Sequence, residues 1–326
     1  MITSFYFDQD LFDDESVQKI PLMTDSILET WEKCGCLAIC NSNRTEIRAA
    51  LTKVDMSLRK KWVEALSSQS YKKNIVSLKK NKLCDLNGIE EFENLFYSEL
   101  IITGLLTSEY EELYKIQNLS VGDVELEVIT PKKFSESRNF NKSKDACLTS
   151  IKAGTDINEI WEERLSKLIY YSSRITIIDR YLASNLLEDI ENGKETSLEF
   201  IFEKLSRFNR NYTVVVYSAC DIPQKDVNAT KIRDYLNNVL TKKPYYKNSN
   251  DIQFSLCKNN LFGNEAHDRL VCIDEHVVEI GKGLDIFRKG DIKNNTFTIK
   301  PKRFSFFREC YNKLSKNREW NYVKPS

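Results

Sequence analysis

The sequence predicts an α/β protein whose C-terminal half contains a layered sheet. From about residue 157 onward, short apolar runs rich in Ile and Val alternate with longer segments of helical periodicity, the pattern of strands joined by helices. The chain has 326 residues and is 41% hydrophobic, so it can bury sizeable cores. That length accommodates one large domain or two ordinary ones.

The N-terminal half shows a less regular alternation of elements. Apolar runs predict three short strands, at residues 5–7, 35–39 and 124–129. Helical periodicity predicts four helices, at residues 24–31, 46–51, 57–66 and 89–117. Ser57 is positioned to act as the N-cap of the third of these helices. We therefore expect a separate N-terminal domain that is either α/β or mostly helical.

A polar segment at residues 132–158 separates the two halves. It is rich in Ser and Asn and contains Gly154, a composition typical of linkers and mobile loops. The sequence therefore predicts a domain boundary near residue 150, with one domain at 1–150 and the other at 151–326.

The C-terminal half gives the clearer pattern. Apolar runs predict strands at residues 174–179, 212–218 and 252–256, and a hairpin formed by 270–274 and 277–280. The turn of that hairpin is expected at Glu275 and His276. Helices are expected at residues 157–170, 183–191, 197–205 and 229–240. Alternating strands and helices of this kind favour a layered sheet.

Composition excludes several classes of protein. No run approaches the roughly 18 to 20 apolar residues of a membrane span, and the N-terminus lacks the features of a signal peptide, so a cytoplasmic location is expected. Nine cysteines are present, but Cys34, Cys36 and Cys40 have no matching pair at zinc spacing. We expect reduced, structural thiols and no metal site built on cysteine.

Charge is balanced in total but uneven along the chain. Residues 1–30 carry seven acidic residues against one lysine, whereas 41–80 and 288–326 are basic. Aromatic residues accompany the cations in the last segment, at Phe304, Phe306 and Phe307. Solvated helix faces explain such segments, and so does a surface for nucleic acid or for acidic lipid.

The motif richest in chemistry is His-x-Arg-x4-Asp-x6-Gly, which begins at His267 and includes Arg269, Asp274 and Gly281. This spacing is that of a phospholipase-D-type phosphodiesterase motif, with Arg in the place of Lys. Together with Asp179-Arg180-Tyr181 and the segment Gly281-Lys282-Gly283-Leu284-Asp285, it resembles the phospholipase-D-like C-terminal domain of MIT-domain-containing proteins and their bacterial relatives. The resemblance extends loosely over residues 157–315.

The resemblance implies a phospholipase-D-like fold and a set of site residues. The implied catalytic residues are His267, Arg269 and Asp274, and the implied ligand-binding residues are Asp179, Arg180, Asp268, Lys282 and Asp285. Eukaryotic relatives bind membrane phospholipid, and some bacterial relatives are expected in anti-phage defence.

Hydrolysis by such a site requires two histidines, one as nucleophile and one as general acid. This chain has only His267 and His276, so an active site would need two copies of His267 in a homodimer. Phosphate recognition without catalysis is the second interpretation, because Arg269 can clamp phosphate oxygens. An ion-pair network of Asp268, Arg269 and Asp285 that holds the sheet is the third.

Gly281 and Gly283 stand too close together to make a phosphate loop, and a tight turn or bulge explains them.

The N-terminal half offers a separate hypothesis. Asp8 follows an apolar strand, more acidic residues come directly after it, and Glu46 opens a helix, an arrangement that resembles the start of a PIN-like nuclease. Such enzymes gather carboxylates around Mg²⁺ or Mn²⁺ to cleave phosphodiesters. Glu125 and Glu127 are weak candidates for further ligands, and a solvated acidic surface is the alternative.

These observations predict a protein that recognises phosphate or phosphodiester groups. Nucleic acid is the expected partner, with nuclease activity in anti-phage defence as a specific form of that function. A non-catalytic adaptor that binds an acidic membrane surface or a partner protein is one alternative, and a phosphodiesterase that uses His267 in a homodimer is another. No cofactor is expected, except Mg²⁺ or Mn²⁺ if Asp8 and Glu46 are catalytic.

Overall fold

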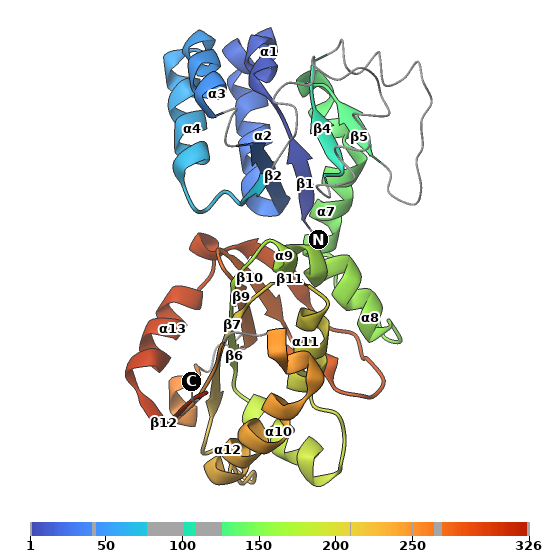
Figure 1. Cartoon of the computed structure of the whole chain (residues 1–326), viewed down its shortest axis with the longest axis vertical. Helices are drawn as coiled ribbons and strands as arrows, with labels where there is room; N and C mark the ends of the chain where they lie inside the picture. Colours follow the sequence, from blue (N-terminus) through green and yellow to red (C-terminus); the bar gives the residue numbers. More distant parts are fainter. Residues whose placement is uncertain are drawn as a thin grey trace. The chain divides into compact units, whose positions relative to one another are not determined.

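The structure is a computed structural model that describes residues 2–40, 44–76, 101–107, 126–208, 210–248, 251–263 and 269–324. The chain divides into two compact units, Met1–Ala146 and Cys147–Ser326. Each unit contains its own sheet, which confirms the α/β prediction for the C-terminal half and selects α/β over mostly helical for the N-terminal half (Figure 1).

Unit 1 is built on a parallel five-stranded sheet. Its strands are β1 (Thr3–Tyr6), β2 (Gly35–Cys40), β3 (Lys73–Val76), β4 (Thr103–Leu105) and β5 (Glu127–Ile129). Their order is β3-β2-β1-β4-β5, and every pairing is parallel. The order reverses at β1, so the carboxyl ends of β1 and β4 border the crevice where open α/β sheets bind ligands.

Helices fill the connections of unit 1. They are η1 (Gln9–Asp13), α1 (Glu15–Lys19), α2 (Pro21–Cys34), α3 (Arg44–Ala50), η2 (Leu51–Lys53), α4 (Met56–Ser67), η4 (Pro131–Glu136) and α7 (Arg138–Leu148). Phe5 of β1 makes edge contacts with Trp31 of α2 and Phe140 of α7, at centroid distances of 5.8 and 5.3 Å. These aromatic contacts fix α2 and α7 on the central strand.

Three expectations for unit 1 are wrong. A helix was expected at 89–117, but part of this range forms β4. Residues 101–106 are all buried, and a fully buried apolar strand lacks the alternation that would distinguish it from a helix. Residues 89–100 and 108–117 lie outside the described residues. The expected loop at 132–158 contains η4 and α7, whose polar composition conceals a buried side with Phe140 and Ser143. Ser57 lies inside α4, which Asp55 precedes as N-cap.

Unit 2 is built on a mixed seven-stranded sheet. Its strands are β6 (Arg174–Asp179), β7 (Thr213–Ala219), β8 (Asp251–Cys257), β9 (Arg269–Ile273), β10 (His276–Ile280), β11 (Phe297–Pro301) and β12 (Arg318–Val323). Their order is β11-β10-β9-β6-β7-β8-β12. Strands β6, β7 and β8 are parallel, and the other four strands are added antiparallel to their neighbours.

Helices cover both faces of this sheet (Figure 1). They are α8 (Ile157–Ile160), η5 (Trp161–Leu165), α9 (Ser166–Tyr170), α10 (Leu182–Glu191), α11 (Ser197–Ser206), α12 (Ala229–Asn238), η6 (Leu240–Lys242), η7 (Pro244–Asn248), η8 (Asn259–Leu261), η9 (Gly283–Phe287), η10 (Lys302–Phe304) and α13 (Phe307–Lys316). Helix α13 lies on one side of the sheet, and α10 and α11 lie on the other.

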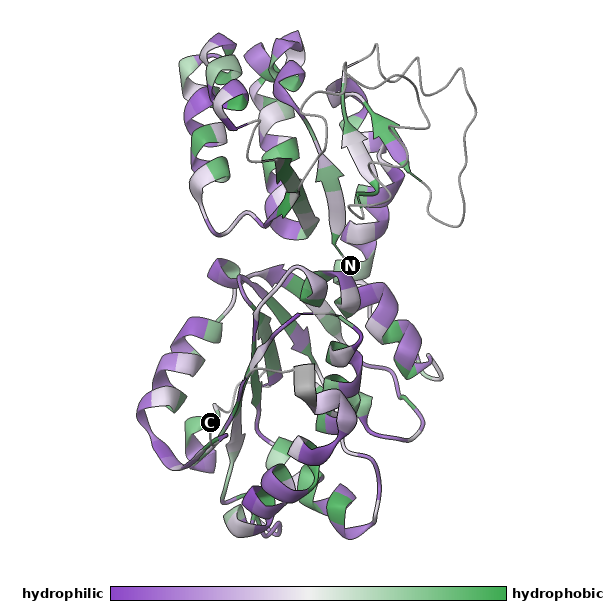
Figure 2. Ribbon diagram, viewed as in Figure 1, coloured by the Kyte–Doolittle hydropathy of each residue, from purple (hydrophilic) through white to green (hydrophobic). Residues whose placement is uncertain are grey.

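The core of unit 2 follows from these amphipathic helices. Phe307 and Leu314 of α13 pack in one buried cluster with sheet residues such as Ile178, Val215 and Leu270. Figure 2 shows hydrophilic and hydrophobic residues on the helices of both units, as expected when one helix face covers a sheet.

The hairpin of β9 and β10 differs from the expectation in its turn. Asp274 and Glu275 make the turn, and Asp274 has a positive φ of 50°. His276, expected on the turn, is fully buried as the first residue of β10, where it pairs with Ile273 and Pro301.

Within the basic C-terminal segment, residues 288–324 are described and fold as part of unit 2. They supply β11, α13 and β12, and β12 pairs with the outer strand β8. Among the described residues, no helix combines the length and apolarity needed to cross a membrane.

Candidate functional site

The candidate site of unit 2 begins at Asp179, the last residue of β6. The β-branched run from Ile175 to Ile178 favours a strand, and it places Asp179 opposite Arg269 at the start of β9. Asp179 is buried, and its carboxylate accepts hydrogen bonds from the backbone N–H groups of Tyr181 (2.9 Å) and Leu284 (2.8 Å). Burial raises the pKa of this carboxyl, while those two donors and Arg269 act in the opposite direction.

Gly283 packs against the Asp179 carboxylate. It has a positive φ of 61°, and a Cβ atom at this position would lie 2.1 Å from Asp179 Oδ2 and 2.9 Å from Arg269 Cδ. Only glycine tolerates both the backbone conformation and this approach. Arg269 Nη1 donates to the carbonyl of Gly281, and the backbone N–H of Leu284 donates to Asp179. The segment 281–284 is therefore bound to both β9 and β6.

Three cations converge on the ring of Tyr181, which lies two residues after the end of β6. The charged groups of Arg269, Arg180 and Lys225 lie 5.0, 5.4 and 5.9 Å from the ring centroid. All three are within the range of cation–π attraction. We call Arg180, Tyr181, Lys225 and Arg269 the Tyr181 cluster.

The cations of the Tyr181 cluster have neutral hydrogen-bond partners. Arg180 Nε donates to the side-chain oxygen of Asn259 (2.6 Å), and Lys225 Nζ donates to that of Asn185 (3.4 Å). Within the described ranges, none of the three cations is within ion-pair distance of a carboxylate. The cluster therefore retains positive charge that an anion could neutralise.

Other predicted ligand-binding residues have structural partners. Asp285 pairs with Arg288 (3.1 Å), which also makes a two-pronged contact with the buried Asp189, at distances down to 2.6 Å. Asp285 therefore belongs to an ion-pair network with Arg288 and Asp189, whereas Asp268, the other expected partner of Arg269, lies outside the described residues. Lys282 precedes η9, and its backbone N–H donates to Asn295 (3.0 Å).

Asp274 lies away from the Tyr181 cluster. Its carboxylate accepts from the backbone N–H groups of Arg174 (3.0 Å) and Ser173 (3.3 Å), at the amino end of β6. Asp274 lies five positions along the chain from Arg269, which in an extended strand corresponds to about 16 Å. The structure therefore does not bring Asp274 and Arg269 together. His267 and Asp268 lie outside the described residues.

In unit 1, Asp8 follows β1 at the carboxyl end of the sheet. It is buried, its Oδ1 accepts from the backbone N–H of Asp10 (3.0 Å), and its Oδ2 has no hydrogen-bond partner among the described residues. Burial, assisted by the charges of Asp10 and Asp13, raises the pKa of the Asp8 carboxyl to about 7.

Glu46 lies in the first turn of α3, which packs against η1. Glu127, considered as a further carboxylate ligand, instead binds the start of α7 through Ser137 Oγ (2.6 Å) and the backbone N–H of Arg138 (2.7 Å). In the part of the chain that the structure describes, no three His, Cys, Asp or Glu side chains gather to hold a metal ion.

Sequence reasoning missed Lys225, Asn185 and Asn259. Lys225 follows Gln224, a residue with a positive φ of 64°, in the loop after β7. Nothing near Lys225 in the sequence indicates its approach to Tyr181, because that contact depends on the pairing of β6 with β7.

Comparisons with known proteins give little support for any family. No family model matches the chain, and no curated protein matches it. Among solved structures, it is similar to TrmBL2, an archaeal chromatin protein described as showing a novel mode of DNA binding, at 14% identity and a TM-score of 0.26. The match covers 71% of this chain and 64% of that protein. A TM-score of this size carries no argument about the ligand of this chain.

Proposed function

We propose that unit 2 binds the phosphodiester backbone of nucleic acid through the Tyr181 cluster. The observation that carries the proposal is the convergence of Arg180, Lys225 and Arg269 on one ring, with none of the three within ion-pair distance of a carboxylate among the described residues. Phosphate oxygens match the geometry of guanidinium groups, and release of counterions makes such contacts favourable.

The position of the cluster supports the same ligand. Arg180 and Tyr181 follow the carboxyl end of β6, and Lys225 lies in the loop after the parallel strand β7. Open α/β sheets bind ligands at this edge. The resemblance of Asp179-Arg180-Tyr181 and of Arg269 to a phospholipase-D-like domain points to phosphodiesters as well.

An acidic membrane is a weaker candidate for this cluster. Binding to a membrane surface combines cations with apolar side chains that enter the lipid. In the described ranges, the exposed large hydrophobic residues lie outside the segments that build the cluster.

Salt dependence of binding tests the proposal. We expect the affinity of the full chain for a fluorescently labelled 20-nucleotide DNA or RNA to fall with KCl, with a log–log slope of about −2 to −3 for three phosphate contacts. Arg180→Gln and Lys225→Gln should each reduce the slope by roughly 0.7 to 0.9. Lys289→Gln is the matched control, because Lys289 is paired with Glu195 and its loss changes net charge equally.

Equal effects of all three variants would contradict a local site and indicate a response to total charge. Absence of binding at low salt, together with binding to vesicles of anionic lipid, would reject nucleic acid in favour of the membrane. The same samples test hydrolysis: degradation that resists EDTA and is lost in His267→Ala would add phosphodiesterase activity to the proposed binding.

A further inference from the structure

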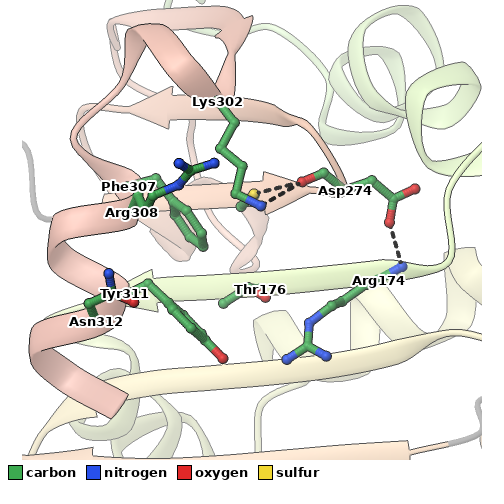
Figure 3. A pocket seen from close by; sticks show the side chains of 9 residues that line it. Arg174, Thr176, Asp274, Lys302, Phe307, Arg308, Tyr311 and Asn312 are labelled. Atoms are coloured by element: carbon green, nitrogen blue, oxygen red, sulfur yellow. Dashed lines mark hydrogen bonds between the residues drawn. The ribbon is translucent and has the colours of Figure 1, made fainter. Parts of the chain in front are cut away.

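A second cation-lined site lies at the other end of β6. It is a cavity of about 370 Å³ between the sheet and α13, lined by Arg174, Thr176, Cys272, Asp274, Lys302, Phe307, Arg308, Tyr311 and Asn312. Figure 3 shows that Arg174, Lys302 and Arg308 come from different elements and surround the same space. Volumes of this size are typical of small-molecule sites.

The charges that line this cavity are mostly positive. Three cations face it, and Asp274 is the one carboxylate among its lining residues. The Asp274 carboxylate is already engaged by the backbone N–H groups of Ser173 and Arg174. It therefore neutralises the guanidinium groups only in part.

The three cations differ in their partners. Lys302 Nζ contacts Glu275 at 3.3 Å. The side chains of Arg174 and Arg308 are exposed, and within the described residues neither is within ion-pair distance of a carboxylate. The guanidinium groups of Arg174 on β6 and Arg308 on α13 are therefore available to bind an anion.

The remaining lining groups add hydrogen bonding and a flat apolar wall. Thr176 is a polar residue only 3% exposed, and its side chain lines the cavity. Tyr311 stacks on Phe307 with ring centroids 5.7 Å apart and an interplanar angle of 21°. Helix α13 starts at the cavity, where Ser305 Oγ accepts from the backbone N–H of Phe307 (3.3 Å), and the positive end of the helix dipole adds to the attraction.

We propose that this cavity binds the phosphate group of a small phosphomonoester of about the size of a nucleoside monophosphate. Arg174, Lys302 and Arg308 hold the phosphate, Thr176 and Asn312 supply neutral hydrogen bonds, and the Tyr311 ring lies against the organic part. The site is separate from the Tyr181 cluster, because Arg174 and Asp179 stand at opposite ends of β6. It does not depend on the proposed binding of nucleic acid.

Calorimetric titration of the full chain with AMP, inorganic phosphate and adenosine tests this site. We expect AMP to bind, inorganic phosphate to compete with it, and adenosine to show no binding. Arg174→Gln and Arg308→Gln should each weaken AMP binding about tenfold or more, because each removes a charge-assisted contact to phosphate. Thermal unfolding without ligand should be unchanged, since both side chains are exposed.

Lys313→Gln is the matched control, because Lys313 is an exposed cation on α13 that does not line the cavity. It should leave AMP affinity within about twofold of wild type, and Arg180→Gln should do the same. Equal weakening by Lys313→Gln, binding of adenosine as tight as that of AMP, or no binding of AMP at millimolar concentration would each overturn the proposal. If the wild-type chain binds AMP but does not bind DNA or RNA, only the proposed role of the Tyr181 cluster is rejected, and the proposal for this cavity stands.

Discussion

At the scale of single residues, Gly283 determines the geometry around Asp179. Gly283→Ala would place a methyl group 2.1 Å from the Asp179 carboxylate, on a backbone with a φ of 61°. We expect a loss of roughly 2 to 4 kcal/mol in the free energy of unfolding, from backbone strain together with displacement of a buried carboxylate. Scanning calorimetry of the full chain measures this loss.

Gly193 provides the control for this substitution. It has the same φ of 61°, but a Cβ atom there would meet nothing within 4 Å. Gly193→Ala should therefore cost only the strain of the left-handed conformation, about 1 kcal/mol. If both variants lose the same stability, the close approach to Asp179 has no energetic consequence.

Asp8 is the residue whose protonation should alter stability most directly. Because burial raises the pKa of its carboxyl from 3.8 to about 7, the folded state holds this proton more tightly than the unfolded state. Asp8 therefore lowers the stability of the fold progressively as pH rises from about 4 to 7. Asp8→Asn keeps an acceptor for the Asp10 N–H and removes the titration.

The free energy of unfolding of Asp8→Asn relative to wild type should increase by roughly 2 to 3 kcal/mol between pH 5 and pH 8. Urea unfolding at both pH values measures this change. Replacing one carboxylate oxygen of Asp8 by an amide nitrogen also changes the free energy of unfolding by an amount that does not depend on pH. The change between the two pH values is therefore the decisive quantity. A difference that stays constant with pH would contradict a raised pKa at Asp8.

At the scale of elements, Glu127 joins the edge strand β5 to the start of α7. Its two oxygens accept from Ser137 Oγ, from the backbone N–H of Arg138 and from that of Asn139, at 2.6, 2.7 and 3.3 Å. A carboxylate at a helix N-terminus also interacts favourably with the helix dipole. This contact explains how a segment of linker-like composition forms a helix.

Glu127→Gln replaces one acceptor with an amide donor that faces N–H groups. We expect unit 1 to lose about 1 to 3 kcal/mol of stability, because partly buried donors at the start of α7 lose their acceptor. Hydrogen exchange of the amides of α7 would report the loss locally. The exposed neighbour Glu136 is the control, and Glu136→Gln should change exchange very little. Comparable exchange in both variants would exclude a capping role for Glu127.

At the scale of the whole molecule, each unit holds a complete sheet. No strand of the seven-stranded sheet comes from unit 1, and no strand of the five-stranded sheet comes from unit 2 among the described elements. A fragment of residues 147–326 should therefore fold alone and unfold cooperatively in calorimetry. It should also retain AMP binding, since every lining residue of that cavity belongs to unit 2. A fragment without a cooperative transition would show that unit 2 requires unit 1.

The strands of unit 2 illustrate what could be predicted from local sequence. β-Branched residues from Ile175 to Ile178 and from Val214 to Val216 favour buried strands, and β6 spans the expected residues 174–179. The same local logic failed at residues 101–106, where burial on all sides hides any period. The prediction from local sequence also failed at α7, because this helix is stabilised by Glu127, which lies on strand β5.

For the candidate sites, the sequence by itself determined which chemical groups are present and where the strands end, so Asp179, Arg180 and Arg269 were identifiable as residues at strand ends. Only the tertiary structure decided which of them meet. The pairing of β6 with β9 places Arg269 beside Asp179 at one end of β6 and Asp274 at the other end. Arg269 and Asp274 are nevertheless close in sequence. Lys225 joins Tyr181, and Arg308 joins Arg174, through the packing of loops and helices on the sheet. Periodicity and propensity depend on neighbouring residues, whereas convergence of like charges depends on contacts between residues far apart in the chain.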